Sequence, residues 1–285
     1  MLLQRIRELA ETEGGESVLL TFYPHPRLVL FPDDNDLKLL STLDEKIEQL
    51  KNSGIQHLIV HPFTKSFSRT SVQEYVQNIL VEGIGTSKLV IGYDHHFGRN
   101  REGSLENLRL LAPEYGFEVE EIPAQEIDDV NVSSTKIRNA LDQGEVARAA
   151  EFLGYAYGLS AKVVKGNEIG RSLGFPTANL SLDDSTKLIP GNGVYAVGVH
   201  FDERLYHGMA NIGYRPTVSQ GSQNRMIEVH LFQFSSDLYG KRLRITFHQR
   251  IRNEHKFDTI DALRAQLQKD AIQAREALAL LGRLA

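Results

Sequence analysis

The chain has 285 residues, which is enough for two ordinary domains with their own cores. Its net charge of −5 gives no overall attraction to nucleic acid, and the absence of cysteine excludes disulfides and thiolate metal sites. No apolar run is long enough to span a bilayer, and residues 1–15 are charged and amphipathic, unlike a signal peptide. We therefore expect a cytoplasmic protein with no nucleic-acid or membrane partner.

The first half of the chain alternates between helical spacing and short apolar runs. Residues 2–13 have helical spacing, and Val18–Phe22 has the pattern of a strand buried on both faces. The helix expected over 41–52 would begin at a Ser41/Asp44 capping pair. Further strands are expected at 58–60, 88–92 and 117–122, and further helices at 70–81, 104–115 and 134–141. This alternation predicts a parallel, doubly wound sheet.

Hydroxyl and basic side chains gather at the predicted start of the last of these helices, in the string VSSTKIR over residues 132–138. Backbone N–H groups at a helix N-terminus attract phosphate. The alternative is an ordinary N-cap, which Ser and Thr supply in many helices. The candidate phosphate ligands are Ser133, Ser134, Thr135 and Arg138.

Two further strings follow predicted strands, where ligands bind in open parallel sheets. Residues 92–103 read GYDHHFGRNREG. Adjacent side chains such as His95 and His96 point opposite ways in an extended segment, so we expect no shared metal ion. Residues 21–26 read TFYPHP, which by itself is only a strand end with a kink.

The pattern changes in the middle of the chain. Residues 143–154 have the spacing of a short helix that would connect a first domain, 1–142, to a second, 155–285. Strand then follows strand, with alternating apolar residues over 195–201, 227–231 and 243–247, which predicts an antiparallel barrel. A final long helix, capped by Asp258, would pack an apolar stripe on it that includes Ile260 and Ile272.

The string GNEIGRSLGFPTAN, residues 166–179, combines three glycines spaced four apart with potential ligands. Glycines let the backbone approach a ligand, and Arg171 can pair with phosphate. Neutral oxygens of Thr177 and Asn179 suit Mg²⁺. The string predicts a loop for a nucleotide polyphosphate and its metal. The alternative is a surface turn, because the spacing is neither the P-loop nor the dinucleotide fingerprint.

One carboxylate, Glu228, lies on a mostly apolar predicted strand. Such a residue is either a charge at the rim of the barrel or a positioned base, and the pattern leaves both open.

Residues 166–179 resemble the G-x-x-x-G-R-x-x-G-x-P-T-A-N signature of riboflavin kinases, and EVHLF at 228–232 resembles their E-x-H-x-F segment. Similar pieces are GVY at 193–195, NIGYRPT at 211–217, LYG at 238–240 and RNEHKF at 252–257. Gln233 and residues 219–221 depart from the usual pattern, in a variable loop or strand end. In the first half, residues 21–26, 94–103 and 132–138 resemble T-F-x-P-H-P, D-x-x-F-G-x-x-R-x-G and I-S-S-T-x-I-R of FMN adenylyltransferases.

The chain thus resembles bacterial bifunctional riboflavin kinase/FMN adenylyltransferases. The resemblance implies a Rossmann-like nucleotidylyl transferase domain followed by a six-stranded antiparallel barrel with a C-terminal helix. It also implies that riboflavin is phosphorylated to FMN by ATP and Mg²⁺, with these small molecules as partners. Glu228 would accept the proton of the riboflavin 5′-hydroxyl.

The resemblance assigns further roles. ATP phosphates would contact Gly166, Gly170, Arg171, Gly174, Thr177 and Asn179, the last two through Mg²⁺. In the kinase, flavin would contact Arg252, Glu254, Lys256 and Phe257, and His230 would be structural or a flavin contact. In the transferase, flavin would contact Phe22, Pro24, His25, Asp94 and Phe97, and phosphate would contact the hydroxyls of residues 133–135 and Arg138.

The transferase family has a strand and a G-x-F-D-G-x-H-x-G-H motif before its first helix, and no such string occurs in this sequence. We expect the first domain to be N-terminally incomplete, with exposed edges on two strands and weak or absent AMP transfer. One alternative is a fully bifunctional enzyme, through a longer natural N-terminus or a strand from another polypeptide. The other is a non-catalytic flavin-binding fragment.

Overall fold

The computed structural model describes residues 2–33, 37–92, 103–122, 132–166, 169–214 and 225–281. It divides into two compact units. The first contains Met1–Leu37 and Lys46–Asn131, and the second contains Lys38–Glu45 and Val132–Ala285. This division differs from the connection expected at 143–154, because helices α7 (Ser134–Asp142) and α8 (Val146–Leu153) share the core of the second unit. The assignment of the first domain to FMN adenylylation and of the second to riboflavin phosphorylation stays a prediction.

The first unit holds two pairs of parallel strands. β1 (Val18–Tyr23) pairs with β2 (His57–Pro62), and β3 (Lys88–Gly92) pairs with β4 (Glu118–Ile122). Parallel pairing agrees with the predicted class. Within the described residues, each pair forms a separate two-stranded sheet, with no strand hydrogen-bonded between them.

Helices are present in all four ranges predicted for this part of the chain, and α2 and η1 are additional to them. The helices are α1 (Leu2–Glu13), α2 (Pro26–Leu30), α3 (Leu43–Lys51, whose first three residues belong to the second unit), η1 (Phe67–Arg69), α4 (Val72–Tyr75), η2 (Val76–Ile84) and α5 (Leu105–Tyr115). The helix expected over 70–81 is a short α-helix, opened by a Ser71/Glu74 capping box, that continues as the π-helix η2. Val76, Leu80 and Leu108 bury the apolar faces of η2 and α5 in one core.

The second unit is a closed antiparallel barrel of six described strands, as predicted. They are β5 (Gly158–Val164), β6 (Ala178–Ser181), β7 (Gly193–Phe201), β8 (Arg204–Tyr214), β9 (Arg225–Leu231) and β10 (Arg242–Arg252), in the order β10-β5-β6-β9-β8-β7. Alternate residues such as Val197, Val229 and Ile245 are fully or almost fully buried inside the barrel. Because successive side chains alternate in direction, their neighbours face outward.

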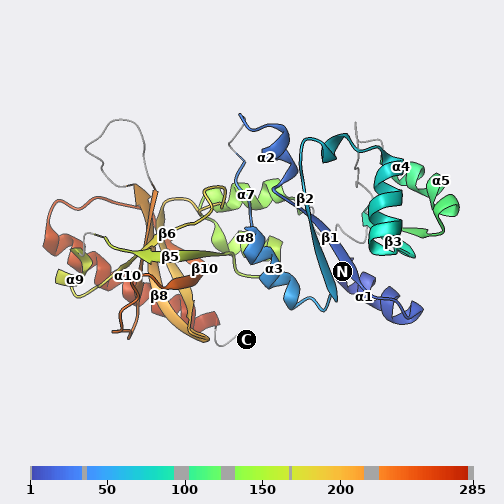
Figure 1. Ribbon diagram of the computed structural model, residues 1–285. Coiled ribbons are helices and arrows are strands. Elements are labelled where there is room, and N and C mark those ends of the chain that lie inside the picture. The colour runs from blue at the N-terminus through green and yellow to red at the C-terminus, as the bar shows by residue number, and fades with distance from the viewer. Residues whose placement is uncertain are drawn as a thin grey trace. The chain divides into compact units, whose positions relative to one another are not determined.

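Helix α10 (Ile260–Leu281) covers one outer face of the barrel (Figure 1). Its buried stripe is built from alanines with Leu278, which allow close approach to Ala196 and Met209. Two predictions for this helix are wrong. Thr259 supplies the cap, accepting a hydrogen bond from Ala262 N, and Ile260 and Ile272 are exposed because they lie off this stripe. No helix in the described part of the chain has the length and apolar character needed to cross a membrane.

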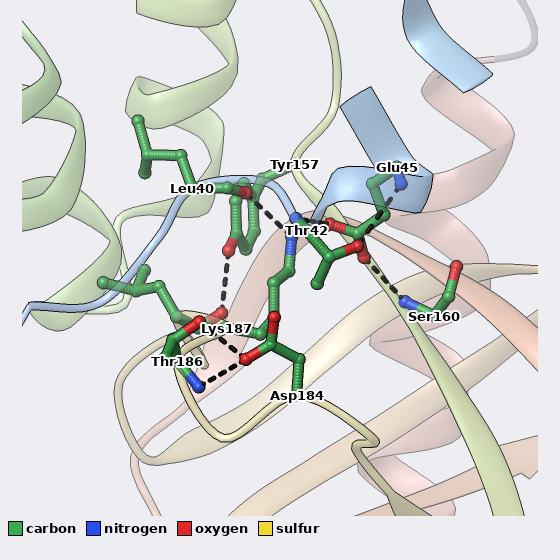
Figure 2. Close-up of polar contacts among 9 residues, drawn as sticks. Leu40, Thr42, Glu45, Tyr157, Ser160, Asp184, Thr186 and Lys187 are labelled. Atoms are coloured by element: carbon green, nitrogen blue, oxygen red, sulfur yellow. Dashed lines mark hydrogen bonds and ion pairs between the residues drawn. The ribbon is translucent and has the colours of Figure 1, made fainter. Parts of the chain in front are cut away.

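Residues 38–45 form a strap that packs with the barrel unit (Figure 2). Leu39 forms a parallel bridge with Lys187, and Leu39 N donates to Thr186 O at 2.7 Å. The first turn of α3 follows, opened by Thr42 and Glu45: Glu45 N donates to Thr42 Oγ1, and Thr42 N donates to Glu45 Oε2. The capping pair is therefore one residue later than the predicted Ser41/Asp44.

A buried ion pair fastens this strap. Lys187 Nζ lies 2.6 Å from Glu45 Oε2 and donates to Leu40 O at 2.8 Å, while Ser160 N donates to Glu45 Oε1. The Lys187 ammonium also lies 4.4 Å from the centre of the Tyr157 ring. Burial lowers the pKa of Lys187, against the raising effect of Glu45. The ion pair thus connects residues 38–45 to the barrel segment that carries Lys187, within one unit.

Candidate active site

A cavity of about 700 Å³ opens on the outer face of the barrel beside α10. Three predicted segments meet in its wall: the Gly-rich loop, the strand that carries Glu228, and residues 252–257. The predicted residues that line it are Gly170, Thr177, Glu228, Arg252, Glu254, Lys256 and Phe257. The second unit therefore collects most of the predicted kinase residues around one space of ordinary ligand size.

Glu228 lies between two asparagines in a row that crosses the barrel. It pairs in register with Asn179 of β6 on one side and with Asn211 of β8 on the other. Residues directly opposite each other on neighbouring strands point to the same face. Glu228 is half-buried in the cavity wall, so the structure places this carboxylate between amides and not at an open rim.

Asn179 is 8% exposed, and its Oδ1 has no hydrogen-bond partner among the described residues. A buried oxygen of this kind calls for a partner. Gly166 packs so closely on Asn179 that a Cβ there would overlap the amide. Thr177 lies two residues before Asn179, and an amide oxygen with a hydroxyl suits a hard cation that takes its remaining ligands from substrate phosphates and water, so the donor set fits Mg²⁺. No cluster of three or more acidic or histidine side chains that could hold a metal occurs in the described residues.

The Gly-rich loop folds back on itself through the short helix α9 (Ile169–Ser172). Phe175 N donates to Gly170 O at 2.8 Å, and Gly174 closes the turn with a φ of +83°, which favours glycine. A Cβ at Gly170 would overlap the carbonyl of Phe175. The folded loop delivers Thr177 to the start of β6, beside Asn179.

Thr177 belongs to the walls of two cavities. The second, of about 630 Å³, is lined by Arg171, Pro176 and residues 234–239. The loop therefore separates two spaces that share Thr177. Arg171, the predicted phosphate ligand, lies on the side away from Glu228.

His230 supports the same loop from β9. Its Nδ1 lies 2.8 Å from Pro176 O, and its ring meets Phe175 and Phe232 edge to face at 5.2 and 5.6 Å. Burial lowers the pKa of His230 below its ordinary 6.5. A neutral imidazole can donate its Nδ1–H to the carbonyl, a positioning contact of the kind expected for this residue.

This burial predicts a loss of stability in acid. The pKa values of His200, His230 and His248 are all lowered, with burial as the largest cause. On unfolding, each returns to about 6.5 and binds a proton, so stability is full above pH 6.5 and falls as the pH drops below it. Denaturant unfolding at pH 7.5 and 5.5 should show this fall, and His230→Gln or His248→Gln should reduce the difference. An equal pH dependence in wild type and both variants contradicts the assignment.

Residues 252–257 were predicted from the resemblance to contact flavin, and all of them except Asn253 line the larger cavity. The guanidinium carbon of Arg252 lies 5.6 Å from the centre of the Phe257 ring. Glu254 Oε2 accepts from Asn192 Nδ2 at 3.3 Å, and its carboxylate packs against Gly213, where a Cβ would overlap it. Lys256 also lines the cavity.

The transferase candidates fall into two groups, one in each unit. In the first unit, Phe22 joins an aromatic cluster with His61, Phe63 and Phe67. Pro24 follows a cis peptide bond, and His25 Nδ1 accepts from Arg27 N at the start of α2. Asp94, Phe97 and residues 215–217 lie outside the described residues.

The other group belongs to the second unit. Ser133 caps α7 by accepting from Lys136 N, Ser134 and Thr135 are exposed, and Arg138 Nε donates to Lys38 O at 2.9 Å. The cap formed by Ser133 agrees with the alternative of an ordinary N-cap for residues 132–138. A phosphate-binding role for these residues stays a prediction. The two groups of transferase candidates are not brought together within either unit.

Sequence reasoning missed two residues of the cavity wall. Asn211 lies in the matched string NIGYRPT, for which no role was predicted, and Asp270 lies in the final helix, where no site residue was expected. A signal for Asp270 existed, because a charged residue beside Ala271 and at helical spacing from Leu267 and Ala274 interrupts the buried face.

Comparison with known proteins identifies the family of the chain. Residues 153–278 match the riboflavin kinase family, and residues 1–136 match the FAD synthetase family. The bifunctional riboflavin kinase/FMN adenylyltransferase of Pseudomonas fluorescens is 36% identical over 274 residues, covering 96% of this chain and 86% of the relative. The protein of the same name from Escherichia coli K12 is 36% identical over 276 residues, covering 96% and 87%.

A third relative of that name, from Listeria monocytogenes, is 35% identical over 280 residues, covering 98% of this chain and 88% of its own length. A crystal structure described as a macrolide-efflux protein from Streptococcus pneumoniae superposes with a TM-score of 0.84 at 31% identity, covering 94% of this chain and 86% of that one. With two family matches and relatives of this identity and coverage, the chain belongs to the bifunctional riboflavin kinase/FMN adenylyltransferase family.

Proposed function

We propose that this chain transfers the γ-phosphate of ATP to the 5′-hydroxyl of riboflavin, giving FMN. The observation that carries the proposal is Glu228, which lines the 700 Å³ cavity with Asn211 and pairs in register with Asn179 on its other side. A carboxylate held there can accept the hydroxyl proton as the oxygen attacks phosphorus.

The two cavities suggest how the substrates would meet. Riboflavin would occupy the larger cavity, against Arg252, Glu254, Lys256 and Phe257, and ATP would occupy the second, with its phosphates near Arg171. Their reacting ends would approach at Thr177, which both cavities share. The close packing of Gly166 and the folded loop hold the backbone against the phosphates.

Mg²⁺ would be held by Thr177 and Asn179, where it would neutralise charge on the transferred phosphate. The unpartnered Oδ1 of Asn179 supports this placement. The chain's own contribution is to orient that oxygen, and Gly166 does so by leaving room for the amide.

Gly166→Ala tests this arrangement. The new Cβ would displace Asn179, so we expect FMN formation to fall on the order of tenfold or more and the Mg²⁺ concentration for half-maximal rate to rise. The measurement is a Mg²⁺ titration of the initial rate. Gly15→Ala is the matched control, because a Cβ there meets nothing within 4 Å. Equal Mg²⁺ curves for the two variants would reject the arrangement.

FMN adenylylation is the second candidate function, favoured by the FAD synthetase match over residues 1–136 and by the names of the relatives. The G-x-F-D-G-x-H-x-G-H motif does not occur in these 285 residues. We therefore expect FAD formation by this polypeptide to be much slower than FMN formation.

One experiment separates the candidates. Purified protein is incubated first with riboflavin and γ-labelled ATP in Mg²⁺, then with FMN and ATP, and the flavins are resolved by chromatography. Labelled FMN in the first reaction indicates the kinase, and FAD in the second indicates the transferase. Riboflavin bound without either product would show a flavin-binding protein and reject the proposal.

A further inference from the structure

A fully buried carboxylate, Asp270, lies at mid-length in α10 and lines the larger cavity. Taking a carboxylate out of water is costly unless hydrogen bonds and an opposite charge compensate. A neutral side chain would fill this position of the helix at lower cost. The presence of the Asp270 carboxylate at this position therefore indicates a role that needs a negative charge.

The partners of Asp270 occupy both of its oxygens. Arg252 Nε lies 2.9 Å from Oδ1 and 3.0 Å from Oδ2, and Arg252 Nη2 lies 2.8 Å from Oδ2. Gln266 Nε2 donates to Oδ1 at 2.8 Å. Such a bidentate pair fixes the plane and direction of the guanidinium as well as its position.

The remaining N–H groups of Arg252 can be counted. A guanidinium has five, of which Nε–H and one on Nη2 point to Asp270, and one on Nη1 donates to Asn253 O at 2.9 Å. One N–H on each Nη is left without a partner among the described residues. The side chain of Arg252 is 21% exposed and lines the cavity. These two N–H groups, one on Nη1 and one on Nη2, form the end-on pair that remains for a ligand.

Phe257 borders the same guanidinium at 5.6 Å, so an aromatic ring and a fixed donor pair lie together in one wall. A planar heteroaromatic ligand with in-plane acceptor atoms would match both features. The flavin ring of riboflavin is such a ligand, and its use here rests on the proposed function.

We propose that Asp270 is a positioning residue for the riboflavin site: it holds Arg252 side-on, so that the end-on N–H pair meets acceptor atoms of the flavin ring. Asp270 itself touches Arg252 and Gln266, and acts on the substrate through Arg252. The effect belongs to binding of the acceptor, because Arg252 and Asp270 line the larger cavity, whereas Arg171, the predicted phosphate ligand, lines the second.

The test compares Asp270→Asn and Asp270→Glu with Asp261→Asn. In Asp270→Asn, an amide N–H would face the guanidinium. In Asp270→Glu the charge pair survives, but the longer side chain displaces Arg252. Asp261 is the matched control, since it lies on the same helix with a side chain that is 93% exposed. The readouts are riboflavin affinity by flavin fluorescence, KM for riboflavin and for ATP, and Tm.

We expect both Asp270 variants to weaken riboflavin binding by about tenfold or more, as for a lost charge-assisted contact, with KM for ATP within twofold. Arg252→Lys should do the same, and Arg252→Lys with Asp270→Asn should be little worse than either alone. If Asp270→Asn does not fold, Asp270→Glu decides. A folded Asp270 variant with riboflavin affinity within twofold of wild type overturns the proposal. Wild-type protein that makes no FMN overturns the proposed function instead.

Discussion

Replacing Glu228 by glutamine is expected to lower kcat for FMN formation by about two to four decades, the span of a general base. Glutamine keeps the size and hydrogen-bonding reach of the side chain between Asn179 and Asn211 but cannot accept the proton of the riboflavin hydroxyl. The substitution removes only the basicity of this position. Riboflavin affinity should therefore change by less than about threefold, far below the effect on turnover.

The measurement is steady-state FMN formation at saturating riboflavin and MgATP, together with Tm to confirm folding. Glu276→Gln is the matched control, because Glu276 is an exposed glutamate on α10. It should retain wild-type kcat. A folded Glu228→Gln variant that loses less than about threefold in kcat contradicts the assignment of the base.

Replacing Lys187 by methionine is expected to lower the free energy of unfolding of the barrel unit by about 3–5 kcal/mol, the usual effect of removing one partner of a buried ion pair. The side chains of Lys187 and Glu45 are 2% and 11% exposed, so Glu45 would stay buried without its cation. Loss of the ammonium also leaves Leu40 O without its Lys187 donor. The strap of residues 38–45 should then detach more readily from the barrel.

Denaturant unfolding measures this effect. Lys241→Met is the control, since Lys241 is exposed, and should stay within about 0.5 kcal/mol of wild type. Lys187→Met with Glu45→Leu should be less destabilised than the two single changes predict together, because the unpaired charge is gone. A Lys187→Met variant within about 1 kcal/mol of wild type would show that the pair contributes little.

The strap has a practical consequence for the kinase. The riboflavin kinase match begins at residue 153, but Glu45 and Leu39 are part of the same compact unit. A fragment that begins at 153 would bury Lys187 without its partner. Such a fragment should be less stable than the barrel unit in the full chain.

The barrel was predictable because its signal is local. Alternation at Tyr195, Val197 and Val199, repeated at Ile227 and Val229, places the interior residues without knowledge of their partners. The strap was not predictable, because the pairing of Leu39 with Lys187 has no local signature. The stripe of α10 was misplaced only in part, at Ile260 and Ile272, since the predicted Leu267 and Leu278 do pack on the barrel. The alanines that complete it were missed because their small side chains carry a weaker hydrophobic signal than isoleucine.

The candidate site divides in the same way. The Gly-rich loop and Glu228 stood out through composition and motif, and the structure brings them to one cavity. The task of Asp270 depends on Arg252, which lies 18 residues earlier and meets it only after α10 folds onto β10. The two groups of transferase candidates belong to different units, so that half of the prediction still rests on the resemblance.

We propose that phosphate passes from ATP to riboflavin at the Glu228 cavity. Incubating the protein with riboflavin and Mg²⁺ in two parallel reactions, one with γ-labelled and one with α-labelled ATP, tests this transfer most directly. We expect label in FMN from the γ-labelled ATP, dependent on Mg²⁺ and abolished or nearly abolished in Glu228→Gln. Labelled flavin from the α-labelled ATP with no γ-labelled FMN, or no labelled flavin in either reaction, would contradict it.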